Sequence, residues 1–122
     1  MFGSKATSDV VTLSAVELKD RLDRGDPIIV LDVREDDERA VSTIPLPTTA
    51  RELHIPLHDV ADRFEDVRAA VGSDPLVVYC HHGVRSLSVA KWLSRQGLGG
   101  VANLTGGIDS WSTSVDPSVP RY

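Results

Sequence analysis

Two unbroken apolar runs most constrain how this 122-residue chain can fold. Residues 28–31 read Ile-Ile-Val-Leu and residues 76–79 read Leu-Val-Val-Tyr, and a proline directly precedes each run. Such a run is typical of a strand that is buried on both faces, as in a parallel sheet covered by helices. The chain is therefore expected to form an α/β domain with a mainly parallel central sheet flanked by helices.

Helices and shorter strands alternate with these two runs. Ser14 and Glu17 have the spacing of a capping box, which predicts a helix that ends near Gly25. Further strands are expected at 10–13, 54–57 and 101–104, and further helices at 35–40, 60–71 and 87–96 and around Trp111. The domain is predicted to span residues 11–115, between a flexible tail over 1–10 and an extended tail over 116–122.

Composition narrows the classes of partner and the cellular compartment. A net charge of −5 argues against a nucleic-acid partner, and no apolar run approaches the roughly 20 residues that span a bilayer. The N-terminus has no apolar stretch of signal-peptide length. A single cysteine forms no internal disulfide and persists best as a thiol in a reducing compartment. These features predict a cytoplasmic protein, and a monomer is the default expectation.

The single cysteine, Cys80, directly follows the second apolar run and precedes a predicted helix. Backbone N–H groups at such a strand-to-helix turn favour an anionic sulfur, whether a thiolate or a persulfide. Arg85 either faces this site or turns inward to pair with a carboxylate such as Asp32. The alternative for Cys80 is an inert core residue. The predicted anion-binding loop comprises His81, His82, Gly83, Val84, Arg85 and Ser86.

Asp32 and Arg34 end the first apolar strand. Ligands of parallel sheets bind beyond the carboxyl ends of the strands, so these two residues are expected near Cys80. We interpret Asp32 as part of a cap or salt bridge that braces the loop, in preference to a proton-transfer group.

Three motifs together resemble one family. Residues 80–86, Cys-His-His-Gly-Val-Arg-Ser, resemble the active-site loop of rhodanese-type sulfurtransferases. Residues 31–35 match the first signature strand of that family, and residues 104–111 match its C-terminal turn. The resemblance implies a rhodanese-like three-layer domain with thiosulfate:cyanide sulfurtransferase activity. In that reaction Cys80 takes the outer sulfur of a small donor anion as a persulfide and passes it to a thiol or cyanide, with no metal or cofactor.

The chain departs from the family pattern in two places. Residues 36–53 lack the usual Gly-His-Ile-x-Gly-Ala segment, so the role of this stretch in acceptor choice stays open. His81 and His82 stand where good thiosulfate users carry permanent cations. Because histidine has an ordinary pKa near 6.5, we expect thiosulfate use to improve as the pH falls toward 6. The tail over 116–122 resembles that of rhodanese domains fused to adenylyltransferases, which suggests a ubiquitin-like sulfur carrier as a partner.

Three alternatives were weighed against sulfur transfer. Phosphatases and arsenate reductases generally place five residues between the cysteine and the arginine, whereas four lie between Cys80 and Arg85. A non-catalytic interaction module remains open, although such modules usually lack the cysteine. A metal site from the histidines is disfavoured, because Pro56 separates His54 from His58 and adjacent histidines diverge on an extended backbone.

Overall fold

Five parallel strands form the central sheet of the computed structural model, which describes residues 10–122. Residues 1–9 of the expected N-terminal tail lie outside the described residues. The strand order is β1-β5-β4-β2-β3. The strands are β1 (Val11–Leu13), β2 (Ile28–Asp32), β3 (Ala50–His54), β4 (Leu76–Tyr79) and β5 (Val101–Leu104). The prediction of an α/β domain built on a parallel sheet is confirmed.

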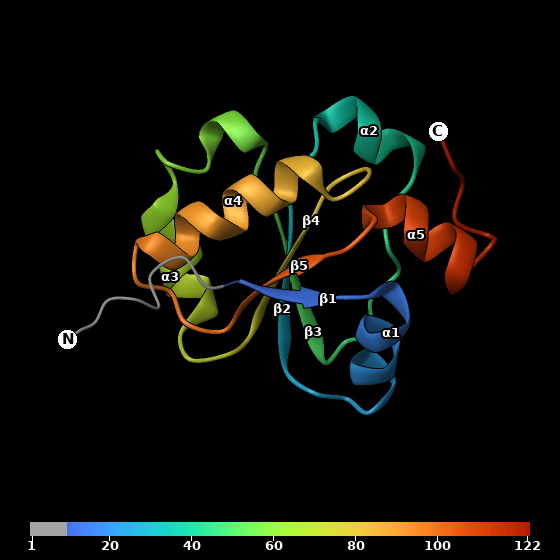
Figure 1. Cartoon of the computed structure of the whole chain (residues 1–122), viewed down its shortest axis with the longest axis horizontal. Helices are drawn as coiled ribbons and strands as arrows, with labels where there is room; N and C mark the ends of the chain where they lie inside the picture. Colours follow the sequence, from blue (N-terminus) through green and yellow to red (C-terminus); the bar gives the residue numbers. More distant parts are fainter. Residues whose placement is uncertain (1–9) are drawn as a thin grey trace.

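Helices cover both faces of the sheet, as Figure 1 shows. One face packs against α1 (Ala15–Asp23) and α5 (Gly107–Ser114), and the other against α3 (Phe64–Val71) and α4 (Val84–Arg95). The short helix α2 (Asp36–Val41) follows the carboxyl end of β2. Within residues 10–122, no helix is long and apolar enough to cross a membrane.

The apolar runs are explained by two separate hydrophobic cores. Ile28 and Val30 pack in the core beneath α1 and α5, while Ile29 and Leu31 pack in the core beneath α3 and α4. Successive side chains of a strand point to opposite faces, so burial on both sides favours apolar residues in succession. The predicted capping box is also present, since the Glu17 backbone N–H donates to Ser14 Oγ at 3.0 Å.

Two predicted elements differ most from the structure. The predicted edge strand over 54–57 is wrong, because β3 runs over Ala50–His54 and pairs with β2, and a 3-10 turn, η2 (Leu57–Asp59), follows it. Pro56 has no N–H to donate to a ladder, so the strand ends before it. The helix predicted over 60–71 begins only at Phe64.

The C-terminal segment 116–122 is not the extended tail that the sequence predicts. It turns at Pro117–Ser118, where the Ser118 N–H and hydroxyl both donate to Asp116 Oδ1. Val119 is then buried in the core beneath α1 and α5. Burial of this apolar side chain holds the segment against the domain and brings Tyr122 to the loop that follows β4.

Candidate active site

Cys80 lies at the carboxyl edge of the sheet, directly after β4. Asp32 at the end of β2 is the register partner of Tyr79, so the two strands end side by side there. The side chain of Cys80 is buried, with 1 % of its surface exposed. The predicted strand–cysteine–helix junction is confirmed, because α4 begins four residues further on at Val84.

Two backbone N–H groups converge on the sulfur of Cys80. Gly83 N–H and Ser86 N–H donate to Sγ at 3.2 and 3.3 Å, and Ser86 Oγ lies 3.3 Å from the same atom. Gly83 adopts a φ of 95°, in the region that favours glycine, which turns the chain into the first turn of α4. The N-terminus of that helix carries partial positive charge. This arrangement favours a negatively charged sulfur.

Asn103 anchors the loop from the neighbouring strand and was missed by the sequence reasoning. Ser86 Oγ donates to Asn103 Oδ1 at 2.6 Å, and Asn103 Nδ2 donates to the Gly83 carbonyl at 3.2 Å. Asn103 is buried within β5, whose other residues are apolar. A polar side chain in a buried strand requires partners, and this requirement was the signal available in the sequence.

The N-terminus of α5 supports the loop from its other side. Ile108 N–H donates to the Cys80 carbonyl at 2.9 Å, and Asp109 N–H donates to the His81 carbonyl at 3.1 Å. Gly107 makes this close approach possible, because a Cβ atom there would lie 2.4 Å from both carbonyl oxygens. The Gly-Gly turn before α5 therefore allows the N-terminus of α5 to hydrogen-bond to the cysteine loop.

Arg85 turns to Glu38 and not to Asp32. Its guanidinium makes two hydrogen bonds to the Glu38 carboxylate, at 2.7 and 2.9 Å. These bonds, against the opposing effect of burial, lower the pKa of Glu38 to about 2. They also raise the pKa of Arg85, and the nearby charge of Cys80 contributes to that rise. Glu38 is a second residue that the sequence reasoning missed.

Asp32 and Arg34 form a fully buried ion pair beside the loop. Arg34 Nε and Nη2 donate to the two Asp32 carboxylate oxygens at 3.0 and 2.8 Å. Burial alone would raise the pKa of Asp32, but the hydrogen bonds from Arg34 outweigh it and lower that pKa. Arg34 also donates to the Tyr122 hydroxyl at 2.9 Å. The structure thus contains the salt bridge, and Tyr122, which stacks on His81, links it to the loop; that the pair braces the loop stays a prediction.

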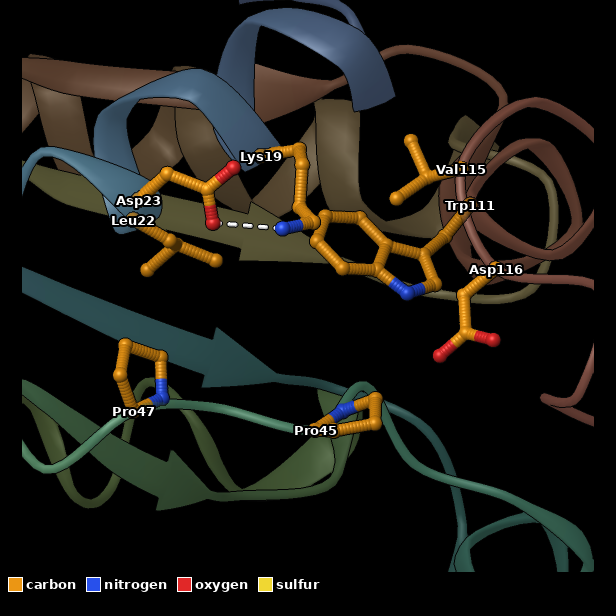
Figure 2. A pocket seen from close by; sticks show the side chains of 8 residues that line it. All are labelled: Lys19, Leu22, Asp23, Pro45, Pro47, Trp111, Val115 and Asp116. Atoms are coloured by element: carbon orange, nitrogen blue, oxygen red, sulfur yellow. Dashed lines mark hydrogen bonds and ion pairs between the residues drawn. The ribbon is translucent and has the colours of Figure 1, made fainter.

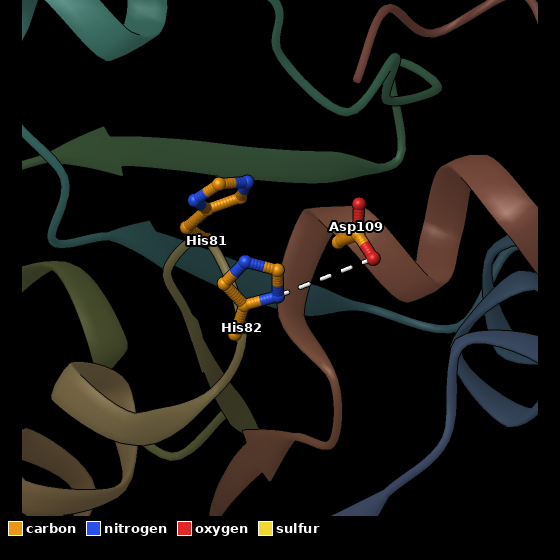
Figure 3. Close-up of side chains that lie close together, drawn as sticks. All are labelled: His81, His82 and Asp109. Atoms are coloured by element: carbon orange, nitrogen blue, oxygen red, sulfur yellow. Dashed lines mark ion pairs between the residues drawn. The ribbon is translucent and has the colours of Figure 1, made fainter. Parts of the chain in front are cut away.

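The two loop histidines lie against each other and do not diverge as predicted, because the loop backbone is turned and not extended. Their ring centroids are 3.9 Å apart, and Tyr122 stacks on His81 with centroids 3.8 Å apart. With Asp109, they form the group in Figure 3, whose ligand-type atoms lie within 4.8 Å of one another. Asp109 already pairs with Arg121 at 2.8 Å. A metal ion at this group would have to displace that guanidinium.

A separate hollow of about 310 Å³ lies between α1, α5 and the Pro45–Pro47 stretch (Figure 2). An ion pair between Lys19 and Asp23 lies at its wall, and the buried indole N–H of Trp111 has no hydrogen-bond partner among the described residues. None of the residues that line this hollow belongs to the cysteine loop. Cys80 and the N–H groups that donate to it therefore do not line this hollow.

The fold and the loop define a rhodanese-like domain, and the chain belongs to that family. The sequence profile of the rhodanese-like domain matches residues 14–114. A putative sulfurtransferase of Bacillus subtilis, YtwF, is 29 % identical over 109 residues, which are 89 % of this chain and 97 % of that protein.

Two further similarities extend this finding. The chloroplastic rhodanese-like/PpiC domain-containing protein 12 of Arabidopsis thaliana is 35 % identical over 94 residues, 76 % of this chain, but the chain spans only 30 % of that protein's length. The crystal structure of a rhodanese-related protein from Thermoplasma volcanium superposes with a TM-score of 0.72 at 26 % identity, covering 92 % of this chain and 99 % of that one. At the level of the family, these similarities support a rhodanese-type sulfurtransferase.

Proposed function

We propose that this protein is a sulfurtransferase that carries sulfane sulfur as a persulfide on Cys80. The observation that carries the proposal is the pair of N–H donors, from Gly83 and Ser86, that meet at Cys80 Sγ. Preorganised donors of this kind stabilise an anionic nucleophile and an anionic intermediate without a metal. The donors close on a single sulfur atom, which suits a persulfide better than a tetrahedral oxyanion.

The reaction has two displacement steps. The Cys80 thiolate attacks the outer sulfur of a donor such as thiosulfate, the S–S bond of the donor breaks, and sulfite leaves with its electron pair. Cys80 then holds a persulfide anion. A thiolate or cyanide attacks the terminal sulfur, forms a new persulfide or thiocyanate, and regenerates the Cys80 thiolate.

The acceptor in the second step is a small thiol or a ubiquitin-like sulfur-carrier protein. The resemblance of residues 116–122 to the tails of adenylyltransferase-fused rhodaneses supports the second choice. Transfer of labelled sulfur from loaded Cys80 to a carrier protein tests it, and the absence of transfer to any carrier would leave the small thiol.

Intact-mass measurement tests the function directly. The protein is incubated with thiosulfate or with the persulfide of 2-mercaptoethanol, and Cys80→Ser serves as the control. We expect one added sulfur on the native protein only, and its removal by cyanide. If no donor adds sulfur, the chain is a non-catalytic interaction module. Turnover of an aryl phosphate that is lost in Cys80→Ser would identify a phosphatase.

A further inference from the structure

The arginines around the cysteine loop are already neutralised by carboxylates. Four guanidiniums and four carboxylates at this edge form ion pairs between 2.7 and 3.1 Å. Their charges cancel, so these pairs offer a doubly charged anion no net attraction. The pairs are Arg34–Asp32, Arg39–Asp32, Arg39–Glu52, Arg85–Glu38 and Arg121–Asp109.

Arg85 is the cation of the loop itself, and Glu38 holds it most completely. Both carboxylate oxygens of Glu38 accept from Arg85, and one of them also accepts from the Tyr122 hydroxyl at 2.9 Å. The fork-to-fork geometry leaves little of the Arg85 charge for a second anion. Arg85 nevertheless stays within electrostatic reach of Cys80.

Two accessible side chains of the loop are Val84, which is apolar, and His82, whose ring nitrogen lies 4.0 Å from the Asp109 carboxylate. Val84 has 75 % of its surface exposed, and it is the first residue of α4, four positions after the cysteine. The ring of Tyr122 lies flat on His81, and burial lowers the pKa of this histidine further below neutrality. A carbon-bearing donor can contact Val84 and the ring of Tyr122 without a countercharge, and these two groups offer no charge to thiosulfate.

We propose that Glu38, by neutralising Arg85, makes this loop select an organic persulfide, R–S–SH, over thiosulfate as the sulfur donor. The inference rests on the proposed sulfur transfer. The Cys80 thiolate attacks the outer sulfur of R–S–SH and forms a new S–S bond, the donor S–S bond breaks, and R–S⁻ leaves and takes up the proton of the transferred sulfur, so that Cys80 holds a persulfide anion. At most two negative charges then meet at the reacting sulfur atoms, whereas three meet when thiosulfate reacts. With no free cation, the loop stabilises the smaller charge better.

Glu38→Gln tests this selection. The amide keeps the shape of the side chain and one oxygen acceptor for Arg85, but it removes the negative charge and the second acceptor. We expect the ratio of thiosulfate to 2-mercaptoethanol-persulfide loading rates, measured by intact mass, to rise about tenfold at low salt. The rise should shrink at high salt because exposed charges are screened. Asp20→Asn is the matched control, since it removes one of the two carboxylate partners of Arg24 at the end of α1 and should leave the ratio unchanged.

Val84→Lys tests the same idea without touching Glu38. It places a permanent cation at an exposed position of the loop, and we expect the thiosulfate ratio to rise there as well. The inference is overturned if native protein loads from thiosulfate as fast as from the organic persulfide, or if neither variant changes the ratio. Loading from neither donor in native protein refutes the proposed function instead, so the two failures are distinct.

Discussion

Gly107 is the position where one methyl group should do most harm to the candidate site. In Gly107→Ala, the new Cβ would lie 2.4 Å from the carbonyl oxygens of Cys80 and His81. The α5 N-terminus and the loop must then separate, which breaks two hydrogen bonds that each contribute about 1 kcal/mol. The φ of +62° adds a cost of about 1–2 kcal/mol for a side chain in the left-handed region. The total loss in free energy of unfolding is about 3–4 kcal/mol.

Gly25→Ala separates the cost of the positive φ from the cost of the close approach between Cβ and the carbonyl oxygens. Gly25 has a φ of +76°, but its nearest neighbour would be Thr49 Cγ2, at an ordinary contact distance of 3.9 Å. This control should therefore lose only the conformational part, about 1–2 kcal/mol. Urea unfolding gives both free energies, and intact mass gives the rate of Cys80 persulfide formation, which should fall only in Gly107→Ala. Equal losses of stability in the two variants would refute the close-approach reasoning.

Three further outcomes are expected. Asn103→Ala leaves the Ser86 hydroxyl without the acceptor that it uses in β5, so urea unfolding should show a loss of about 2 kcal/mol in free energy of unfolding, and sulfur loading should slow. A loss of free energy near zero would show that the Asn103 hydrogen bond does not stabilise the loop. The pKa of Glu38 is about 2 in the folded protein against 4.5 ordinarily, so its stabilising effect is present above pH 4.5 and disappears as the pH falls toward 2. Thermal melting should show this loss of stability at acid pH in native protein and a smaller loss in Glu38→Gln. Burial, and then the charge of His82, lower the pKa of His81, so the expected gain in thiosulfate use on acidification should begin below pH 6.5; identical pH profiles for native protein and a His81→Ala, His82→Ala double variant would contradict it.

Much of the framework follows from local patterns in the chain. The apolar runs at 28–31 and 76–79 predicted buried parallel strands, because both faces of such a strand are covered and apolar side chains are favoured at nearly every position. The capping box at Ser14 predicted a helix start for an equally local reason. Residues 50–54 were missed because Arg51 and Glu52 face solvent at the edge of the sheet, and such a strand carries no apolar signature.

The candidate site also has features that follow from the local sequence and features that depend on the fold. The place of Cys80 between a strand and a helix, and the turn at Gly83, are properties of seven neighbouring residues. The partner of Arg85 cannot be predicted from neighbouring residues, because Glu38 lies 47 positions away and several other carboxylates were equally available in the sequence. The same holds for Asn103 and Tyr122, whose contacts depend on strand order and on a tail that folds back.

The amino-acid sequence by itself determined that an α/β sheet would present one cysteine at the carboxyl end of a buried strand, within an N–H-rich loop. Short-range spacing is sufficient for that, since backbone hydrogen bonding and apolar periodicity act over a few residues. Only the tertiary structure decided which charges remain free around the sulfur. Charge pairing depends on distances between segments that the sheet brings together, and here it leaves the loop arginine neutralised by Glu38.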